Sequence, residues 1–287
     1  MRVTPTVFPR AEDAGRALAS LIADDLATKD PATPYLLGCP SGRSPHSTYQ
    51  ALAREVSRRS LDLSGLVIVM MDEYAEPDGD NSSLRRVDDS LEHSCARYGR
   101  RHIVDALNAA AGSGHGIAEE NFWVPDPSEG EGYDERIAGH GGIDLFILAT
   151  GASDGHIAFN PPGADVDSRT RVVRLSEETR RDNLGTFPTF DNELDRVPRH
   201  GVTVGIGTIR DQSRQVVMVA HGEQKANSVR RLGEAERYEP DWPATILSDC
   251  ARPRLFIDEA AARGLASDPD QHHTDRSRSA HAAANSF

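Results

Sequence analysis

Residues 34–56, PYLLGCPSGRSPHSTYQALAREV, decide the fold of this chain. The continuous apolar run at residues 34–39 predicts a strand that is buried on both faces. A polar turn follows, and then Tyr49, Leu52 and Val56 recur at helical spacing. A buried strand, a polar turn and an amphipathic helix form one repeating unit of an α/β fold.

Five further apolar runs predict strands of the same kind: LVIVMM (66–71), IDLFILAT (143–150), VTVGI (202–206), VVMVA (216–220) and RLFI (254–257). Between them, the spacing of Ala17, Leu18, Leu21 and Ile22 predicts an N-terminal helix, and residues 134–138 predict part of another. The alternation predicts an α/β fold with a doubly wound, mostly parallel sheet and helices on both faces.

The length of 287 residues allows one large α/β domain or two small ones. We expect a single domain over residues 1–266 and a loop at residues 112–116 (GSGHG). Residues 267–287 are polar and nearly free of large apolar side chains, which predicts a disordered tail whose histidines are solvated.

The acidic composition of the chain argues against nucleic acid as a binding partner. The chain has 32 Lys and Arg against 45 Asp and Glu, for a formal net charge of −13. An acidic surface repels nucleic acid, so no nucleic-acid partner is expected, although a few local cations still allow a small phosphorylated ligand.

The three cysteines are widely spaced and form no zinc-binding or CxxC pattern, which predicts reduced thiols. The N-terminus shows no signal peptide, and no apolar run approaches a membrane span. We therefore expect a cytoplasmic protein without a membrane partner.

Unusual polar residues follow four of the predicted strands, and ligands of open α/β sheets bind at these strand ends. After the first strand, Gly42 would let the backbone approach an anion, Ser44 could cap the next helix, and Pro45 suits its first position. An ordinary strand-to-helix turn explains this segment equally well, and the P-loop spacing is absent.

Asp72 and Glu73 follow the second strand, where burial can make a carboxylate a general base, although a helix cap or surface turn is the alternative. After residues 143–150 the chain continues Gly151-Ala152-Ser153-Asp154-Gly155-His156. A carboxylate two residues before an imidazole can fix its tautomer for proton transfer. Lys225 follows the 216–220 strand in the first turn of a helix, where a cation is disfavoured unless it shares an anion.

In their order along the chain, these segments resemble the glucosamine-6-phosphate deaminase and 6-phosphogluconolactonase superfamily. PSGRSPHSTYQAL, MDEY, IDLFILATGASDGHIAFN, SRTRVVRLSEETRRDN, VTVGIGTI and GEQKANSV carry the resemblance, which covers residues 8–265. It is closest to the deaminases and implies a Rossmann-like sugar-phosphate isomerase fold.

The resemblance also implies residue roles. Asp72 would move a proton between C1 and C2 of the open-chain sugar, and His156, held by Asp154, would help to open the ring. Residues 41–44 (Ser41, Gly42, Arg43 and Ser44), with Glu73 and Lys225, would bind the substrate and its phosphate. Neither a metal nor an organic cofactor is implied.

Two positions depart from the deaminase pattern. Pro161 stands where deaminases carry a glutamate of the histidine's proton relay, and Gly185 stands where they carry a phosphate-binding arginine. The loop DGHIAFNPPG instead resembles the lactonases, although these usually carry arginine at the position of Tyr74.

The sequence therefore predicts an aldose–ketose isomerase or deaminase that acts on a phosphorylated amino sugar, and we expect this enzyme to be a hydrolase. A sugar-phosphate lactonase and a non-catalytic sugar-phosphate sensor remain alternatives. The particular sugar, any effector and assembly into a homo-oligomer stay open.

Overall fold

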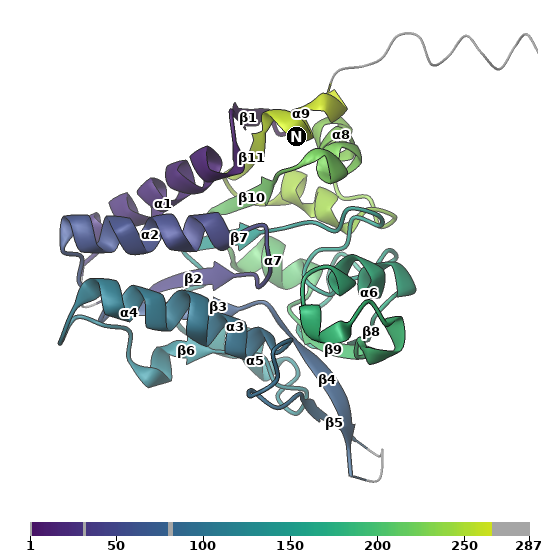
Figure 1. Cartoon of the computed structure of the whole chain (residues 1–287), viewed down its shortest axis with the longest axis horizontal. Coiled ribbons are helices and arrows are strands. Elements are labelled where there is room, and N and C mark those ends of the chain that lie inside the picture. The colour runs from purple at the N-terminus through teal and green to yellow at the C-terminus, as the bar shows by residue number, and fades with distance from the viewer. Residues whose placement is uncertain (1, 31–32, 80–82, 266–287) are drawn as a thin grey trace, which may run out of the picture.

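The buried strand of residues 34–39 forms β2 (Tyr35–Cys39), in the interior of a seven-stranded sheet in the computed structural model (Figure 1). The structure describes residues 2–30, 33–79 and 83–265, so the predicted tail lies outside the described residues. The other strands of this sheet are β1 (Pro5–Phe8), β3 (Leu66–Met70), β6 (Phe122–Trp123), β7 (Leu145–Leu148), β10 (Val216–Ala220) and β11 (Pro253–Asp258).

The strand order is β1-β11-β10-β7-β2-β3-β6, and every neighbouring pair is parallel. This confirms the predicted parallel α/β sheet. From β2 the chain adds β3 and β6 on one side, whereas from β7 it adds β10 and β11 on the other. The order therefore reverses between β2 and β7, and a crevice opens at the carboxyl ends of these two strands.

Helices cover both faces of the sheet, as predicted (Figure 1). One face carries α1 (Ala11–Thr28), α2 (His46–Arg59) and α4 (Asp105–Ala111), and the other carries α5 (Gly132–Gly139), α7 (Ile206–Gln212) and α8 (Ala226–Glu234). Three short helices complete the set in the described residues: α3 (Cys95–Gly99), α6 (Glu177–Leu184) and α9 (Glu259–Ala262). One π turn, Arg100–Val104, joins α3 to α4.

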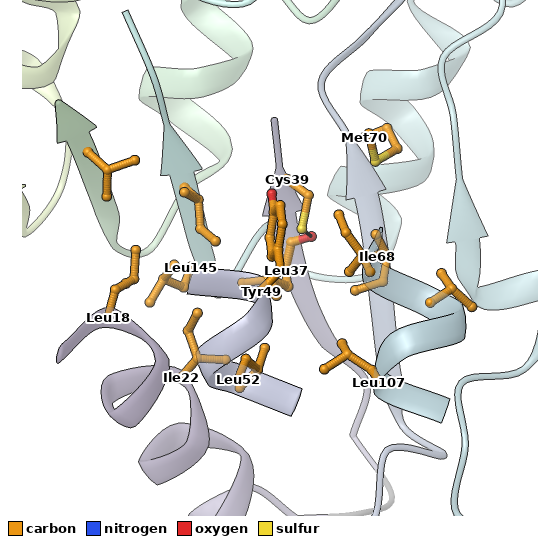
Figure 2. Close-up of a cluster of buried hydrophobic side chains, with 14 of the residues drawn as sticks. Leu18, Ile22, Leu37, Cys39, Tyr49, Leu52, Ile68, Met70, Leu107 and Leu145 are labelled. Carbon is orange, nitrogen blue, oxygen red and sulfur yellow. Dashed lines mark hydrogen bonds between the residues drawn. The ribbon is translucent and has the colours of Figure 1, made fainter. Parts of the chain in front are cut away.

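The core on the α1 and α2 side explains why the N-terminal segments fold as they do. Leu18 and Ile22 of α1 and Leu52 of α2 are fully buried, and Figure 2 shows them gathered around Leu37 of β2. Burial of one such side chain contributes about 1.5–3 kcal/mol. The apolar stripe predicted for the N-terminal helix is thus the face that α1 packs on the sheet.

A second sheet of four antiparallel strands, in the order β5-β4-β9-β8, was not predicted. Its strands are β4 (Asp72–Asp78), β5 (Ser83–Arg86), β8 (Arg171–Arg174) and β9 (His200–Thr203). The prediction that residues 202–206 form a strand of the parallel sheet was wrong. β9 ends at Thr203 in the small sheet and α7 begins at Ile206, because a short apolar run fits a buried helix start as well as a strand.

The junction of the two sheets positions a carboxylate at the crevice. β3 ends at Met70, and Asp72 is already the first residue of β4, where it pairs with Thr203. The chain between them is held because the amide of Val204 donates to the carbonyl of Met71 at 2.9 Å. Asp72 therefore lies on regular backbone rather than in a surface turn.

Candidate active site

A cavity of about 580 Å³ lies in the crevice at the carboxyl ends of β2, β3, β7 and β10. Segments from all four strand ends line it, together with the segment that follows α6. The lining includes Ser41, Gly42, Arg43, Ser44, Asp72, Tyr74, Cys95, Thr150, Gly151, His156, Asp182, Gly185, His221 and Lys225. Most of the residues singled out from the sequence thus meet in one place.

The loop of residues 40–45 forms one wall and differs in one detail from the prediction. α2 begins at His46 after Pro45, and no side chain caps it, so Ser44 is not the predicted cap. The carbonyl of Ser44 instead lies 3.0 Å from Nε2 of His221. Gly42 has φ +95°, a backbone conformation that residues with a side chain rarely adopt. The amides of residues 41–44 make no hydrogen bond within the described part of the chain, which leaves them available to an anion.

Asp72 is the buried acid of the cavity, with 6% of its surface exposed. Burial raises its pKa to about 7, a hydrogen bond from Cys95 opposes this rise, and the neighbouring charge of Glu73 adds to it. The Cys95 sulfur in turn accepts a hydrogen bond from the Ser41 hydroxyl at 3.3 Å. Asp72 can therefore exchange a proton near neutral pH.

Glu73 points away from the cavity. It is fully buried, and its two carboxylate oxygens accept hydrogen bonds from the amides of Tyr74, Cys95 and Ala96 and from the Ser94 hydroxyl, at 2.7–2.9 Å. Burial raises the pKa of Glu73 although these bonds oppose the rise. Glu73 thus fixes the start of α3, and with it Cys95, beside Asp72.

Asp154 and His156 form a hydrogen-bonded pair in the loop after β7. Nδ1 of His156 lies 2.6 Å from Oδ1 of Asp154, while Oδ2 accepts from the hydroxyls of Thr179 at 2.9 Å and Ser176 at 3.1 Å. Burial alone would raise the pKa of Asp154, but the hydrogen bond and charge of His156 outweigh it and lower that pKa. Because an ionised carboxylate only accepts, Nδ1 carries the proton and Nε2 is left for the cavity.

Two glycines make this tight loop possible. A Cβ atom on Gly151 would lie 2.2 Å from Nδ1 of His156, and one on Gly155 would lie 2.4 Å from the Trp242 ring. Gly155 also has φ +65°. A side chain at either position would displace the Asp154–His156 pair.

Lys225 lies at the turn from β10 into α8, in a 3₁₀ segment (Glu223–Lys225) directly before α8. Its Nζ donates to the carbonyl of Thr150 at 2.5 Å. Burial lowers the pKa of Lys225, while Asp182 and Asp154 oppose this shift and Arg43 adds to it. Lys225 is therefore a desolvated cation in the electrostatic reach of Arg43, which suits a shared anion.

Asp182 was not singled out from the sequence, although it lines the cavity. Its Oδ2 accepts from the amides of Ala152 at 2.9 Å and Ser153 at 3.3 Å, which ties α6 to the loop after β7. Ligand atoms of Asp154, His156 and Asp182 lie within 4.8 Å of one another, a grouping that could hold a metal ion. Asp154 and His156 already bond to each other and Lys225 supplies a cation nearby, so the group is also satisfied without a metal.

Arg43 and Gly185 face each other across the cavity wall. A Cβ atom on Gly185 would meet the Arg43 guanidinium at 3.7–3.9 Å, an ordinary contact distance. The guanidinium thus lies where a side chain from position 185 would begin. The Arg43 side chain is exposed, and it forms no salt bridge with an acid of the described residues. Its charge is therefore available to a bound anion.

The sequence model of the family described as glucosamine-6-phosphate isomerases and 6-phosphogluconolactonase matches residues 9–256. The chain belongs to this family. A glucosamine-6-phosphate deaminase of Arthrobacter sp. (strain FB24) is 35% identical over 261 residues, which cover 90% of this chain and 91% of that protein. A deaminase of Bacillus pumilus (strain SAFR-032) is 32% identical over 260 residues, 88% of this chain and 96% of the relative.

Solved structures of the family have the same fold. A monomeric glucosamine-6-phosphate deaminase superposes with a TM-score of 0.77 at 27% identity, over 92% of this chain and 99% of that one. A 6-phosphogluconolactonase from Trypanosoma brucei superposes with a TM-score of 0.64 at 20% identity, over 92% of this chain and 100% of that one. At that identity, the second likeness shows the fold alone.

The structure places the two positions that depart from the deaminase pattern, Pro161 and Gly185, in different surroundings. Pro161 does not line the cavity of His156 but a separate groove that includes Arg174 and Ser176. Gly185 does line the cavity, opposite Arg43. The change at Pro161 is therefore outside the cavity wall, whereas the change at Gly185 leaves a space that another side chain of this protein reaches.

Sequence reasoning missed Cys95, His221 and Asp182, all of which line the cavity. His221 stands four residues before Lys225, in a segment that the sequence did mark, and its position after β10 could have identified it. Cys95 and Asp182 lie on helices far from the strand ends in sequence. Only the folded chain brings them there.

Proposed function

We propose that this protein converts a phosphorylated 2-amino sugar into a ketose phosphate with release of ammonia. The observation that carries the proposal is Asp72, a buried carboxyl with a pKa near 7 that faces the same cavity as an imidazole held by Asp154. The membership in the family and the 35% identity to a deaminase support the same activity.

Asp72 acts as the base of the isomerisation. As a carboxylate it takes the proton from C2 of the open-chain sugar, and the resulting acid returns a proton to C1. A base works best when its pKa is near the working pH, which the burial of Asp72 provides. Return of the proton to C1 leaves an imine at C2, and water hydrolyses this imine to the ketose with release of ammonia. The hydrolase expected from the sequence is therefore better described as an isomerising deaminase.

His156 assists ring opening. Its Nδ1–H is held by Asp154, so its Nε2 faces the cavity and can pass a proton to or from the ring oxygen. The hydroxyls of Thr179 and Ser176 hold Asp154 in place from α6 and its cap. Asp154 is in this account a positioning residue for the imidazole.

The phosphate lies at the loop of residues 41–44. The free amides of this loop, the Arg43 guanidinium and the Lys225 ammonium surround one end of the cavity. Amides at a helix start and two cations form a typical phosphate site. Glu73, which the sequence analysis placed among the substrate ligands, instead supports Asp72 by fixing α3, because its oxygens are already occupied.

The Cys95 thiol lowers the pKa of Asp72, and the pH dependence of kcat/KM tests this effect. Because the thiol hydrogen bond lowers the pKa of Asp72, Cys95→Ala should raise that pKa further. Asp72 is active when ionised, so kcat/KM should rise with pH through about 7 in the wild type and at a higher pH in the variant. Cys250→Ala removes another buried thiol, outside the cavity lining, and serves as control. An identical alkaline rise in Cys95→Ala and wild type would contradict the hydrogen bond.

A sugar-phosphate lactonase is the second candidate, because the loop from Asp154 to Gly163 ends in Pro-Pro-Gly and His156 could activate water. The surroundings of Tyr74 favour the deaminase. Tyr74 is 1% exposed, and its ring packs on Phe159, Phe187 and Phe190 at centroid distances of 4.9–6.4 Å. An arginine at this position, which the resemblance implies for the lactonases, would place a guanidinium among these three rings, whereas tyrosine fills the space with an apolar ring.

A substrate panel tests the proposed function. The purified protein is given glucosamine 6-phosphate, galactosamine 6-phosphate and 6-phosphogluconolactone, and ammonia, ketose and acid are measured separately. We expect ammonia and ketose in equal amounts from an amino sugar phosphate. Acid release from the lactone alone would establish the lactonase, and binding without any product would establish the sensor.

Two further expectations accompany this function. No helix of the described residues is long and apolar enough to cross a membrane. Location in the cytoplasm remains a prediction, in keeping with the three buried, unpaired cysteines. Assembly into a homo-oligomer also remains open, since a solved relative is described as monomeric.

A further inference from the structure

A second cavity, of about 350 Å³, lies beside the active-site cavity. It is bounded by the start of α2, by α3 with the π turn that follows it, and by residues 186–188. Gly42, Arg43, Thr186 and Phe187 line both cavities and so form the wall between them. The proposed function gives this second cavity no role.

Its walls are basic in an acidic protein. Arg43, Arg97, Arg101, His46 and His102 line it, with Glu92 as the single acid. None of the three arginines forms a salt bridge with an acid in the described ranges, although the chain has 45 acidic residues against 32 lysines and arginines. Within the described residues, the Arg97 guanidinium donates only to the carbonyl of Ser90. Three arginines that form no ion pair in the described ranges, against one acid in the lining, give the cavity a positive local potential.

The rings of His46, Tyr98 and His102 lie close together in this cavity. The His102 ring lies 5.2 Å from the ring of His46 and 4.7 Å from that of Tyr98. Burial lowers the pKa of His102, and the charges of His46 and Arg101 lower it further. His102 thus lies in the field of Arg101 in a cavity whose lining holds a single acid, Glu92, and a bound anion would offset this positive charge.

The cavity is also tied to the loop of the active site. The Tyr98 hydroxyl donates to the carbonyl of Gly42 at 2.8 Å, and Nδ1 of His46 lies 3.3 Å from the same hydroxyl. The side chains that line the second cavity therefore bond directly to the backbone that surrounds the first. A ligand in the second cavity would contact this loop from its other side.

We propose that this second cavity is a binding site for a small phosphate-bearing anion, either free phosphate or a phosphate monoester. Arg97 and Arg101 provide planar guanidinium groups that bind phosphate oxygens in pairs, and His46 and His102 add ring nitrogens. The cavity has room for a ligand of a few heavy atoms beyond the phosphate. The site is separate from the proposed catalytic site and needs no turnover.

Calorimetric titration with inorganic phosphate tests the site. We expect wild-type protein to bind two phosphates, one in each cavity. The double variant Arg97→Ala/Arg101→Ala should lose one of them, through a rise in its Kd of ~10-fold or more, because hydrogen bonds to charged groups contribute ~1.5–3 kcal/mol each. Arg54→Ala, which removes an exposed arginine of α2 outside both cavities, should keep both.

The outcomes separate this site from the proposed function. A wild type that binds one phosphate, unchanged in the double variant, would overturn the second site while the catalytic site stands. Two phosphates in both proteins would also overturn it. The single variant Arg101→Glu repeats the test if the double variant melts early. A parallel titration with glycerol 3-phosphate shows whether free phosphate or a monoester binds more tightly.

Discussion

Asp72→Asn is expected to lower turnover of an amino sugar phosphate by ~10²-fold or more while substrate binding stays nearly unchanged. The amide keeps the shape of the side chain and a hydrogen-bonding oxygen, but it cannot accept the C2 proton. The substitution should therefore lower kcat and leave KM nearly unchanged. Steady-state kinetics gives both constants, and near-normal turnover in this variant would remove Asp72 from the mechanism.

The same variant should be more stable than the wild type at alkaline pH. The folded-state pKa of Asp72 is about 7, well above the ~3.9 of an unfolded aspartate. Between these two values the folded protein holds a proton that the unfolded chain has released, so stability falls as pH rises through this window. By pH 8 the whole penalty is present, and Asp72→Asn removes it.

We expect a gain of roughly 2–4 kcal/mol in the free energy of unfolding at pH 8, which shrinks towards pH 4. Urea unfolding at several pH values measures it. Asp105→Asn, at an exposed aspartate of α4, should show no such pH-dependent gain. A variant that loses activity without this gain would be inactive for a reason other than the buried charge.

Arg43→Ala is expected to raise KM for the phosphorylated substrate by ~10–100-fold, in line with ~1.5–3 kcal/mol for a hydrogen bond to a charged group. The guanidinium lies at the cavity wall opposite Gly185, the position for which the resemblance to deaminases implies a phosphate-binding arginine. The unphosphorylated sugar should be affected little, because it lacks the charge that Arg43 binds. Arg54→Ala is the matched control.

A variant that carries the arginine at position 185 instead of position 43 tests the role of Arg43 more strictly. Gly185 has φ −77°, which suits any residue, and the three heavy atoms nearest to a Cβ there belong to the Arg43 guanidinium, at 3.7–3.9 Å. The double variant Arg43→Ser/Gly185→Arg should therefore recover most of the affinity that Arg43→Ala loses. If Arg43→Ala binds substrate and phosphate like the wild type, Arg43 is not the phosphate ligand.

The sequence predicted the parallel sheet well because its strands are continuous apolar runs. Residues 216–220 coincide with β10, and residues 34–39 contain β2. The second sheet escaped prediction because the apolar run that begins in β9 was assigned to the parallel sheet and the other strands carry no such continuous run. β4, with the sequence DEYAEPD, is polar, and its burial comes from contacts with distant segments.

The candidate site could be predicted only in part, for a similar reason. Strand ends converge in any parallel sheet, so the positions of Asp72, His156 and Lys225 followed from the pattern. Cys95 reaches Asp72 only because Glu73 holds α3, and Asp182 resembles an ordinary exposed acid of a helix until α6 packs on the β7 loop. Such contacts between segments distant in sequence have no local signature.

Hydrogen exchange during turnover tests the central claim most directly. The protein is incubated with glucosamine 6-phosphate in D₂O, and NMR follows deuterium at C1 of the ketose phosphate together with released ammonia. If Asp72 takes the proton from C2, exchanges it with solvent and then protonates C1, deuterium should enter C1 as ammonia appears, and Asp72→Asn should abolish both. Product formation at the wild-type rate in Asp72→Asn, or acid released from 6-phosphogluconolactone with no exchange into any amino sugar phosphate, would contradict the account.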